Sequence, residues 1–417
     1  MKVAHILRKY DPAAWGGTET AVLRLTEGLR AENIDSVVYC PRSAAAAPDP
    51  FQAIGCPVKR YRSFLPVAGL SQASREQLIA WGGNLMSLDL PVRLLAEPGL
   101  EVIHTHALNR LAGAARLAAR LRRIPLAITI HGGALDLPET VKERLTAPLE
   151  GGFEWGKMFG FLLRSRQVLA EADAVFTCNP READLLREKY PRQRVEVVPH
   201  AVPAATYERD HRAAARQAFP QLAGREPLLV MGRLEAVKNQ VWLVDQLPEI
   251  LRRHPRVLAV LAGSTTDSGY EQELRRRIGA TVPADSVLLT GGLAPQSPEV
   301  IGLFQLARAL ALPSLAETFG LVIIEAWAAG TPVISTRTSG ALSLVRDGEN
   351  GWLFDLDPPA GFHQAVAAAL AGGAACERLT ASARKLVRER YDVPALGRRM
   401  RSLYGELIAA RKSGGCP

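Results

Sequence analysis

Two carboxylates, Glu317 and Glu325, stand in the stretch of sequence whose residue types are most specific, PSLAETFGLVIIEAWAAG, residues 313–330. An apolar run ends at Pro313, a polar turn follows, and the apolar helix pattern after it surrounds Glu325. A carboxylate on an apolar face loses hydration and needs hydrogen-bond donors in exchange. Arginine or backbone groups are the simpler source of those donors. The alternative is a bound ligand rich in hydroxyl groups.

The beginning of the same predicted helix favours the interpretation that a ligand is bound. The first N–H groups of a helix have no partner within it, so those of Phe319, Gly320 and Leu321 would form an anion site. Glu325 follows one to two turns later. An anion site beside a carboxylate predicts a ligand that carries both a phosphate and hydroxyl groups.

Two cations, Arg233 and Lys238, stand five residues apart in MGRLEAVK, after a predicted strand of the second half. A strand-to-helix turn of this length lets both side chains reach one anion. Arginine offers a bidentate fork and lysine a point charge, a pair that suits a diphosphate. Ordinary solvated surface charges are the competing interpretation.

Glycines and a histidine follow two strands of the first half. Gly16 and Gly17 open a helix, where glycine lets a ligand approach the backbone and the N–H groups favour a phosphate. A tight turn without a ligand explains them equally well. His131 ends the strand LAITIH and could donate a hydrogen bond or titrate near neutral pH. A histidine satisfied within the core is the alternative.

The sequence predicts neither a metal ion nor a cofactor. His104 and His106 form an H-T-H that lacks a third ligand at metal spacing, so we interpret them as structural, or as supports for a neighbouring site. Asp355 and Asp357 form a D-x-D beside two prolines, which is more typical of a solvated turn than of a metal site.

These residues are positioned by two alternations of short apolar strands and amphipathic helices. In the first half, strands are predicted at 3–7, 36–40, 58–61, 102–105, 126–130, 174–178 and 195–198. Helices are predicted there at 18–32, 110–123, 162–172 and 180–189. Strands of this kind separated by helices indicate a parallel sheet covered on both faces. The arginines of helix 110–123 are interpreted as its solvated side, and residues 135–161 as either a lid or a helical excursion that buries its aromatic rings.

A segment rich in Ala, Arg, Asp and Pro, residues 202–227, reads as a linker before the second alternation. Strands are predicted after it at 228–231, 257–261, 287–289, 309–312, 333–335 and 352–354. Helices are predicted at 241–253, 272–278, 298–306, 320–329, 362–371, 380–389 and 395–410. Two α/β halves in tandem predict a ligand cleft at the carboxyl ends of their sheets.

Composition excludes several classes of protein. The 417 residues are 47% hydrophobic and carry a net charge of +9 that is spread over both halves, which disfavours nucleic-acid binding. Five scattered cysteines argue against a disulfide framework and fit a reducing compartment. Neither a signal peptide nor a spanning segment is evident. We expect a cytoplasmic protein, and a peripheral contact with the inner membrane face stays open.

The chain resembles the retaining, nucleotide-sugar-dependent glycosyltransferases of family 4, which have the GT-B fold. The resemblance rests on an ordered set of motifs: GGT, ITIHG, EADAVFTCN, VEVVPHAVP, GRLEAVKN, PSLAETFGLVIIEAWAAGTPVIST and LVRDGENGWLF. It implies two Rossmann-like, doubly wound parallel-sheet domains that face each other across a cleft. Residues 1–205 would bind the acceptor, 206–392 would bind the nucleotide-sugar, and a C-terminal helix in 393–417 would cross back to the first domain.

The resemblance also implies a role for each candidate residue. Glu325 would hold the ribose, Arg233 and Lys238 the diphosphate, and Glu317 the hydroxyls of the transferred sugar. Amides at Gly17 and Leu321 would assist at the diphosphate, and those of Phe319 and Gly320 at the sugar. His131 would contact that sugar and position the reacting centre. The base would lie near Gly263 and Leu293, and Gly16 completes the predicted donor site.

Three departures from the family pattern limit what can be assigned. Ser343 stands where the family has a carboxylate, Asn239 follows Lys238 in place of glycine, and the linker reads PHAVP. The first could alter the donor pocket, so the sugar is not assigned. The expected donor is a UDP-sugar, and the acceptor a glycan, a lipid or a small molecule. A nucleotide-sugar epimerase, a phosphorylase-like enzyme and a non-catalytic binding protein remain as alternatives.

Overall fold

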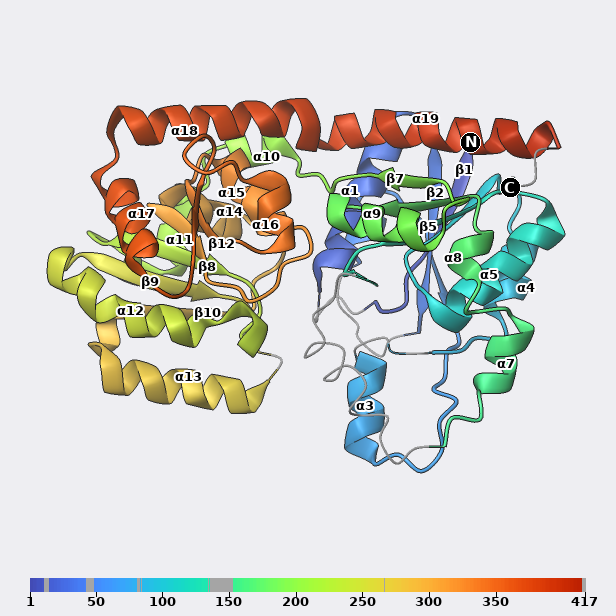
Figure 1. Ribbon diagram of the computed structural model, residues 1–417, viewed down its shortest axis with the longest axis horizontal. Coiled ribbons are helices and arrows are strands. Elements are labelled where there is room, and N and C mark those ends of the chain that lie inside the picture. Colours follow the sequence, from blue (N-terminus) through green and yellow to red (C-terminus); the bar gives the residue numbers. More distant parts are fainter. Residues whose placement is uncertain are drawn as a thin grey trace. The chain divides into compact units, whose positions relative to one another are not determined.

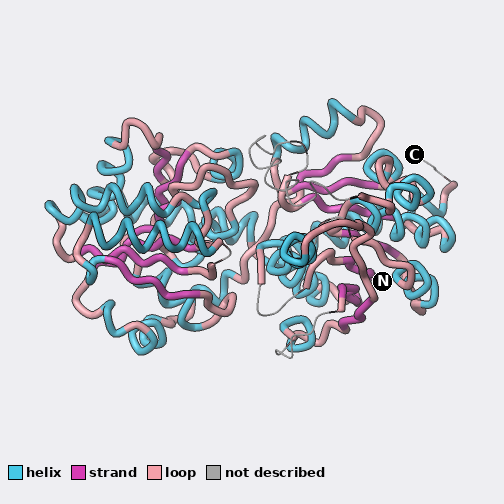
Figure 2. Tube along the Cα trace, turned by 90° about the horizontal axis from the view of Figure 1, so that it is seen from below, coloured by secondary structure: helices cyan, strands magenta, loops and turns pink. Residues whose placement is uncertain are grey.

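The computed structural model describes residues 1–10, 15–42, 49–80, 83, 85–133, 135, 153–265 and 267–414. The chain divides into two compact units. Unit 1 comprises residues 1–199 together with 393–417, and unit 2 comprises residues 200–392. In each unit helices flank the strands on both sides (Figure 2).

Unit 1 is built on a seven-stranded sheet with the order β3-β2-β1-β4-β5-β6-β7. All of its pairings are parallel. The strands are β1 (Lys2–Ile6), β2 (Asp35–Pro41), β3 (Val58–Tyr61), β4 (Val102–Thr105), β5 (Leu126–Ile130), β6 (Ala174–Thr177) and β7 (Val195–Val197). Because alternate residues of a strand face opposite ways, Ile103 packs with α5 while its neighbour His104 faces the side that α19 covers.

The helices of unit 1 come from both ends of the chain. They are α1 (Gly17–Ala31), α2 (Pro50–Ala53), α3 (Gln72–Ala80), α4 (Leu90–Ala96), α5 (Asn109–Arg122), α7 (Lys157–Leu162), α8 (Val168–Glu171), α9 (Pro180–Lys189) and α19 (Val393–Lys412). The last of them packs along α1 (Figure 1). The two backbones touch, since a Cβ added to Gly397 would lie 2.2 Å from the carbonyl oxygen of Gly28. This contact joins the chain's last helix to its first domain, as the family resemblance predicts.

Unit 2 is built on a six-stranded sheet with the order β10-β9-β8-β11-β12-β13, again parallel throughout. Its strands are β8 (Glu226–Met231), β9 (Val257–Ala262), β10 (Val287–Gly291), β11 (Ala309–Leu312), β12 (Val333–Thr336) and β13 (Trp352–Phe354). The predicted α/β fold class, with two parallel sheets, is confirmed.

The helices of unit 2 surround this sheet. They are α10 (Ala204–Glu208), α11 (Arg212–Ala218), η3 (Pro220–Leu222), η4 (Ala236–Lys238), α12 (Gln240–Arg253), α13 (Ser268–Thr281), η5 (Ala284–Ser286), α14 (Pro298–Leu306), α15 (Leu321–Ala329), α16 (Ser339–Leu344), α17 (Ala360–Ala371), α18 (Gly373–Leu386) and the π-helical turn η6 (Val387–Tyr391). Each strand of this sheet is followed by a helix or a 3₁₀ turn, so the loops that leave the strands lie at the carboxyl edge of the sheet.

The predicted helix over residues 162–172 is wrong. The chain instead forms α7 and α8 with a break between them, where Arg164 has a φ of 51° and the Ser165 N–H donates to the carbonyl of Gly160 at 2.8 Å. A residue in the left-handed region ends a helix. Most of the predicted lid or excursion at 135–161 lies outside the described residues.

The predicted linker over residues 202–227 is also wrong. Three short helices, α10, α11 and η3, occupy it, and Tyr207 is fully buried among them. The amide of Gln305 donates to the carbonyls of Tyr207 and Arg209. α11 packs so closely on α14 that a Cβ at Gly302 would lie 2.3 Å from the carbonyl oxygen of His211.

The interpretation of helix 110–123 is wrong for two of its arginines. Arg110 and Arg116 are buried, and they pair with Glu154 and Glu171. These acids come from segments that pack over the helix, so a positive charge on its inner side is neutralised there. Helical periodicity cannot show such partners.

No helix among the described residues combines the length and the apolar character that crossing a membrane requires. Cys40, Cys56, Cys178 and Cys376 are free thiols.

Candidate functional site

Two glycines bring strand ends together at the carboxyl edge of the unit 2 sheet. Gly232 follows β8 and Gly263 follows β9, with φ of 153° and 158°. A Cβ on Gly263 would lie 2.0 Å from the carbonyl oxygen of Gly232, so no other residue fits there without moving the backbone. The N–H of Gly263 donates to the carbonyl of Gly291 at the end of β10. The predicted base-binding residue Gly263 therefore lies where three strands end.

The two predicted phosphate ligands follow β8 and are held by different carboxylates. Arg233 has 51% of its side chain exposed and pairs with Glu235 at 3.0 Å. Lys238 ends η4, is 20% exposed, and pairs with Glu317. The amide of Gln240 donates to the carbonyl of Arg233 at 2.9 Å and anchors the turn to the beginning of α12.

The Lys238–Glu317 ion pair joins residues 79 positions apart. Two backbone contacts hold the segments in place: the N–H of Leu315 donates to the carbonyl of Val237 at 2.8 Å, and the amide of Asn239 donates to the carbonyl of Pro313 at 3.2 Å. The side chain of Glu317 is 11% exposed, so its negative charge lies at the surface only in part. The backbone contacts between the two segments therefore hold Lys238 and Glu317 next to each other.

α16 fixes Glu317 from the other side. The carbonyl of Glu317 accepts from the N–H of Gly340 at 2.8 Å and from the hydroxyl of Ser339 at 3.3 Å, while Ser314 donates to its carboxylate at 3.3 Å. A Cβ at Gly340 would lie 2.7 Å from both the Glu317 carbonyl oxygen and the Phe319 nitrogen, so this helix rests directly on the loop.

α15 begins at this loop. Gly320 is its N-cap, with a φ of 88° and no capping side chain, so the first N–H groups are left to backbone or ligand partners. Phe319 is buried, with its ring centroid 4.9 Å from that of His200. Leu321, Val322 and Glu325 are the half-buried residues of α15, whereas the next two turns are otherwise buried. Glu325 therefore lies on the same outward stripe as the beginning of the helix, one turn further along.

Leu293, the last predicted donor residue of unit 2, is half-buried in the loop after β10. Its neighbour Gly292 lies against Ser264 of the loop after β9, where an added Cβ would come within 3.1 Å. The loops that carry Gly263 and Leu293 are thus adjacent. Unit 2 brings most of the predicted donor residues to one edge of its sheet.

In unit 1, Gly16 is the N-cap of α1 and Gly17 its first residue. A buried carboxyl, that of Glu19, already lies at this helix end: a Cβ on Gly16 would be 2.9 Å from its Oε2. Burial raises the pKa of Glu19, while hydrogen bonds from the backbone N–H groups of Gly16 and Glu19 oppose the rise. Glu19 was not among the predicted site residues, although an acid in the first turn of a helix is a recognisable signal.

His131, which follows β5, is half-buried and belongs to a histidine cluster. Its Nε2 lies 2.8 Å from Nδ1 of His106, and Nε2 of His106 lies 3.1 Å from Nδ1 of His5. His5 was missed by sequence reasoning. In the sequence, His5 stands out only as a polar residue inside the apolar run VAHIL. The cluster becomes visible only when β1 pairs with β4, which sets His5 opposite His104.

His104 belongs to the same cluster but bonds elsewhere. Its Nδ1 lies 2.6 Å from the hydroxyl of Tyr404 on α19, and its Nε2 lies 2.6 Å from the hydroxyl of Thr129. Burial lowers the pKa of His5 to about 3 and that of His104 well below its ordinary value. Both rings are neutral at physiological pH. The interpretation of the H-T-H as structural fits His104, while His106 contacts the candidate residue His131 directly.

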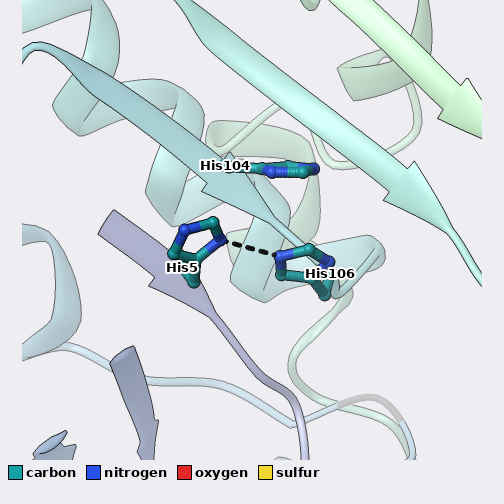
Figure 3. A group of neighbouring side chains, drawn as sticks. All are labelled: His5, His104 and His106. Atoms are coloured by element: carbon teal, nitrogen blue, oxygen red, sulfur yellow. Dashed lines mark hydrogen bonds between the residues drawn. The ribbon is translucent and has the colours of Figure 1, made fainter. Parts of the chain in front are cut away.

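His5, His104 and His106 are also the one group of potential metal ligands in the described ranges, with ligand atoms within 4.8 Å of one another (Figure 3). Both nitrogens of His104 are already bonded to hydroxyls. The D-x-D behaves as predicted: Asp355 is 66% exposed and pairs with Arg337 at 3.6 Å.

Two protein-family models match this chain, one over most of each unit. A model described as "Glycosyl transferase 4-like domain" matches residues 16–201, and one described as "Glycosyl transferases group 1" matches residues 212–386. Among curated relatives, the D-inositol 3-phosphate glycosyltransferase of Nocardia farcinica is 31% identical over 81% of this chain and 73% of its own length. The alpha-D-kanosaminyltransferase of Streptomyces kanamyceticus is 28% identical over 79% and 83%.

Solved structures share the fold over nearly the whole chain. HepE of Anabaena, in complex with UDP and glucose, superposes with a TM-score of 0.72 at 18% identity and covers 97% of this chain and 100% of its own. The sucrose-phosphate synthase of Thermosynechococcus elongatus superposes with a TM-score of 0.71 at 22% identity, covering 98% and 99%.

Proposed function

The chain belongs to family 4 of the glycosyltransferases, which have the GT-B fold, and from this we propose that it moves a sugar from a nucleoside diphosphate-sugar to an acceptor hydroxyl. We propose further that the donor is a UDP-sugar, that the anomeric configuration is retained, and that no metal takes part. The observation that carries the proposal is the Lys238–Glu317 ion pair beside the beginning of α15, at the carboxyl edge of the unit 2 sheet.

The two cations supply the charge that a departing diphosphate needs. Lys238 and Arg233 are each paired with a carboxylate. A diphosphate would take the place of these carboxylates as the anionic partner, so each cation exchanges one partner for another and is not stripped of all of them. Fixed positive groups aimed at developing negative charge are commonly the largest catalytic contribution.

The remaining contacts to the donor would come from residues at the same carboxyl edge of the unit 2 sheet. Glu325 would accept hydrogen bonds from the ribose hydroxyls, and the Leu321 amide would donate to the diphosphate. Once Lys238 turns to the phosphate, Glu317 would accept from hydroxyls of the sugar, assisted by the amides of Phe319 and Gly320. The base would lie against the adjacent loops that carry Gly263 and Leu293.

In the transfer, the acceptor oxygen forms the bond to the anomeric carbon, and the bond from that carbon to the β-phosphate oxygen breaks. The acceptor proton leaves with the diphosphate or passes to solvent. His131 would contact the sugar and orient the reacting carbon. Retention follows either from attack on the face that the diphosphate leaves or from a covalent intermediate, and Glu317 would be the candidate nucleophile only in the second case.

Relatives favour uridine without deciding the sugar. HepE was solved with UDP, with UDP and glucose, and with UDP-glucose, while the curated relatives differ in the acceptor or sugar that their names state. Ser343 stands where the family has a carboxylate, so we assign no particular sugar.

The test is product analysis with the full chain, UDP-, GDP-, ADP- and dTDP-sugars, and a panel of glycan, lipid and small-molecule acceptors. We expect transfer from a UDP-sugar, an α-linked product from an α-linked donor by NMR, and unchanged turnover in EDTA. Donor isomerised without acceptor would identify an epimerase, and transfer from a sugar phosphate a phosphorylase. Binding of UDP without turnover on any acceptor would indicate a non-catalytic binding protein.

We propose, as a separate point, that α7 and the residues before it contact an anionic membrane surface. Five large apolar side chains lie exposed there: Phe153 (72%), Trp155 (42%), Met158 (63%), Phe161 (84%) and Leu162 (67%). Lys157 and Arg166 beside them are exposed cations. Apolar side chains interleaved with cations are typical of segments that lie in a membrane interface.

Vesicle co-sedimentation tests this contact. The protein should bind vesicles with anionic lipid more strongly than neutral ones, and the double substitution of Phe161 and Leu162 by serine should abolish the difference. Leu342→Ser changes a 54% exposed leucine of unit 2 and serves as the matched control. Equal sedimentation of all three proteins would reject the contact.

A further inference from the structure

A cavity of about 250 Å³ lies at the amino edge of the unit 2 sheet. β8 and β11 pair there, and Arg225 and Arg308 directly precede these two strands. Arg216 lines the cavity from α11, the helix that packs on α14. The other lining residues are Leu222, Ala223, Gly224, Pro227 and Leu306. Among the residues that the structure describes, the lining therefore carries three positive charges and no acid.

This cavity is separate from the candidate donor site of the same unit. Arg233 and Lys238 follow the carboxyl end of β8, whereas Arg225 stands before its amino end. β8 has six residues and spans about 20 Å at about 3.3 Å per residue. A small ligand in the cavity would therefore not reach the predicted donor residues.

Arg225 is held in place by the backbone. Its Nε and Nη2 donate to the carbonyls of Arg256 and Val257 at 3.3 Å and 3.1 Å, and 22% of its side chain is exposed. Its Nη1 pairs at 3.3 Å with Asp285, which is 77% exposed and does not line the cavity. A guanidinium has five N–H groups, so these three bonds leave two for a ligand. Because the side chain is already ordered, a ligand loses little affinity in ordering it.

The other two arginines are incompletely neutralised. Arg308 shares the carboxylate of Glu226 with Arg256, and each pair measures 3.2 Å. Arg216 forms no ion pair with any described residue, and its charge acts on Asp210, an exposed acid that does not line the cavity. In the ion pairs of this edge two carboxylates serve three arginines, and Arg216 adds a fourth positive charge. Two positive charges are left in excess.

We propose that the cavity lined by Arg216, Arg225 and Arg308 binds a phosphate group. Guanidinium forks match the oxygens of a phosphate, and a concave surface lined by charges of one sign strengthens their attraction for an anion. A water molecule takes up about 30 Å³ in the liquid, so the cavity has room for a phosphate and a small organic group attached to it. The ligand is inorganic phosphate or a phosphorylated small molecule, and the site goes beyond the proposed function.

Isothermal titration of the full chain at constant ionic strength tests the site. Inorganic phosphate and glycerol 3-phosphate are titrated in saturating UDP, which keeps them from the donor site. We expect one site with a dissociation constant below about 1 mM for at least one of them. Tighter binding of glycerol 3-phosphate would identify a phosphorylated small molecule as the ligand, and equal or weaker binding would identify inorganic phosphate. A native protein that binds neither would overturn the proposal.

Two arginines of the cavity can be changed without leaving a carboxylate unpaired. The double substitution Arg216→Gln and Arg308→Gln keeps Glu226 paired with Arg256. It should weaken phosphate binding by about 10-fold or more, because charge-assisted hydrogen bonds are lost. A smaller loss of affinity would overturn the proposal.

A matched control removes the same amount of charge elsewhere. Arg253 shares the carboxylate of Glu249 with Arg252, and Arg192 is exposed and forms no ion pair with a described residue. The double substitution Arg192→Gln and Arg253→Gln should leave phosphate binding unchanged. An equal loss in this control would show attraction by net charge alone and would also overturn the proposal.

A titration of Lys238→Ala without UDP separates this site from the donor site. Phosphate should bind this variant as it binds the native protein in UDP, and loss of binding would place the phosphate at the donor site instead. Failure of UDP to bind the native protein would count against the proposed function alone, because the titrations without UDP still test the cavity.

Discussion

The two units place opposite kinds of polar group at the carboxyl ends of their strands. Unit 2 presents charges, Lys238 against Glu317, with 20% and 11% of the side chains exposed. Unit 1 presents neutral rings, with His5 and His104 fully buried. A charged ligand can replace a partner of an ion pair that reaches the surface in part, but it cannot enter a fully buried neutral cluster without a large cost in hydration. The first arrangement suits binding, and the second suits holding one group in a fixed state.

The largest expected effect tests the charged region. Lys238→Ala should lower kcat by about 10²–10³, or about 3–4 kcal/mol, because the departing diphosphate loses a fixed cation. Steady-state kinetics at saturating donor measure this change. Lys385→Ala removes a lysine that is 76% exposed on α18 and should change nothing. Near-full turnover of Lys238→Ala would refute the assignment.

The next effect separates nucleotide binding from catalysis within unit 2. Glu325→Gln should weaken the affinity for UDP by about 10–100-fold, because a hydrogen bond to a charged group contributes about 1.5–3 kcal/mol. Isothermal titration with UDP measures the dissociation constant. Glu349→Gln, at a carboxylate that is 66% exposed on the surface, is the control. Unchanged affinity in both variants would move the ribose contact to another residue.

The neutral region makes the protein sensitive to acid. Burial lowers the pKa of His5 to about 3. Below pH 6.5 the unfolded chain therefore binds a proton at His5, whereas the folded chain does not. The unfolding free energy should therefore fall by about 1.4 kcal/mol per pH unit for each such histidine as pH drops from 6.5 toward 4. His104, whose pKa is lowered in the same direction, adds to the slope.

Denaturant unfolding at pH 7, 6 and 5 measures this slope. His5→Phe should reduce it by about one proton, since one group that refuses protonation is gone. An identical slope in the variant would mean that His5 does not stay neutral in the folded state.

The smallest effect concerns the last helix. Tyr404→Phe removes the hydroxyl bonded to His104 and should lower the unfolding free energy by about 1 kcal/mol, the net contribution of a typical hydrogen bond. The kcat should not change, because both ring nitrogens of His104 bond to protein hydroxyls and not to His131. A loss of kcat without a loss of stability would show that Tyr404 and His104 contribute to catalysis.

The sequence predicted thirteen strands in their correct places because apolar runs of three to five residues, bounded by glycine, proline and polar residues, are a local signal. The predictions were wrong where contacts with residues distant in the sequence determine burial or where a helix ends. Arg110 and Arg116 are buried against acids that lie 44 and 55 residues away in the chain, and the helix at 162–172 breaks at Arg164.

By itself, the sequence determined the α/β fold class and the resemblance to the glycosyltransferases, because these rest on periodicity and on ordered motifs. The tertiary structure alone decided that Lys238 meets Glu317 and that His5 joins His106 and His131. In both cases parallel strands far apart in sequence become neighbours in a sheet. Which strands are neighbours is fixed by packing over the whole unit, and no local stretch of residues encodes it.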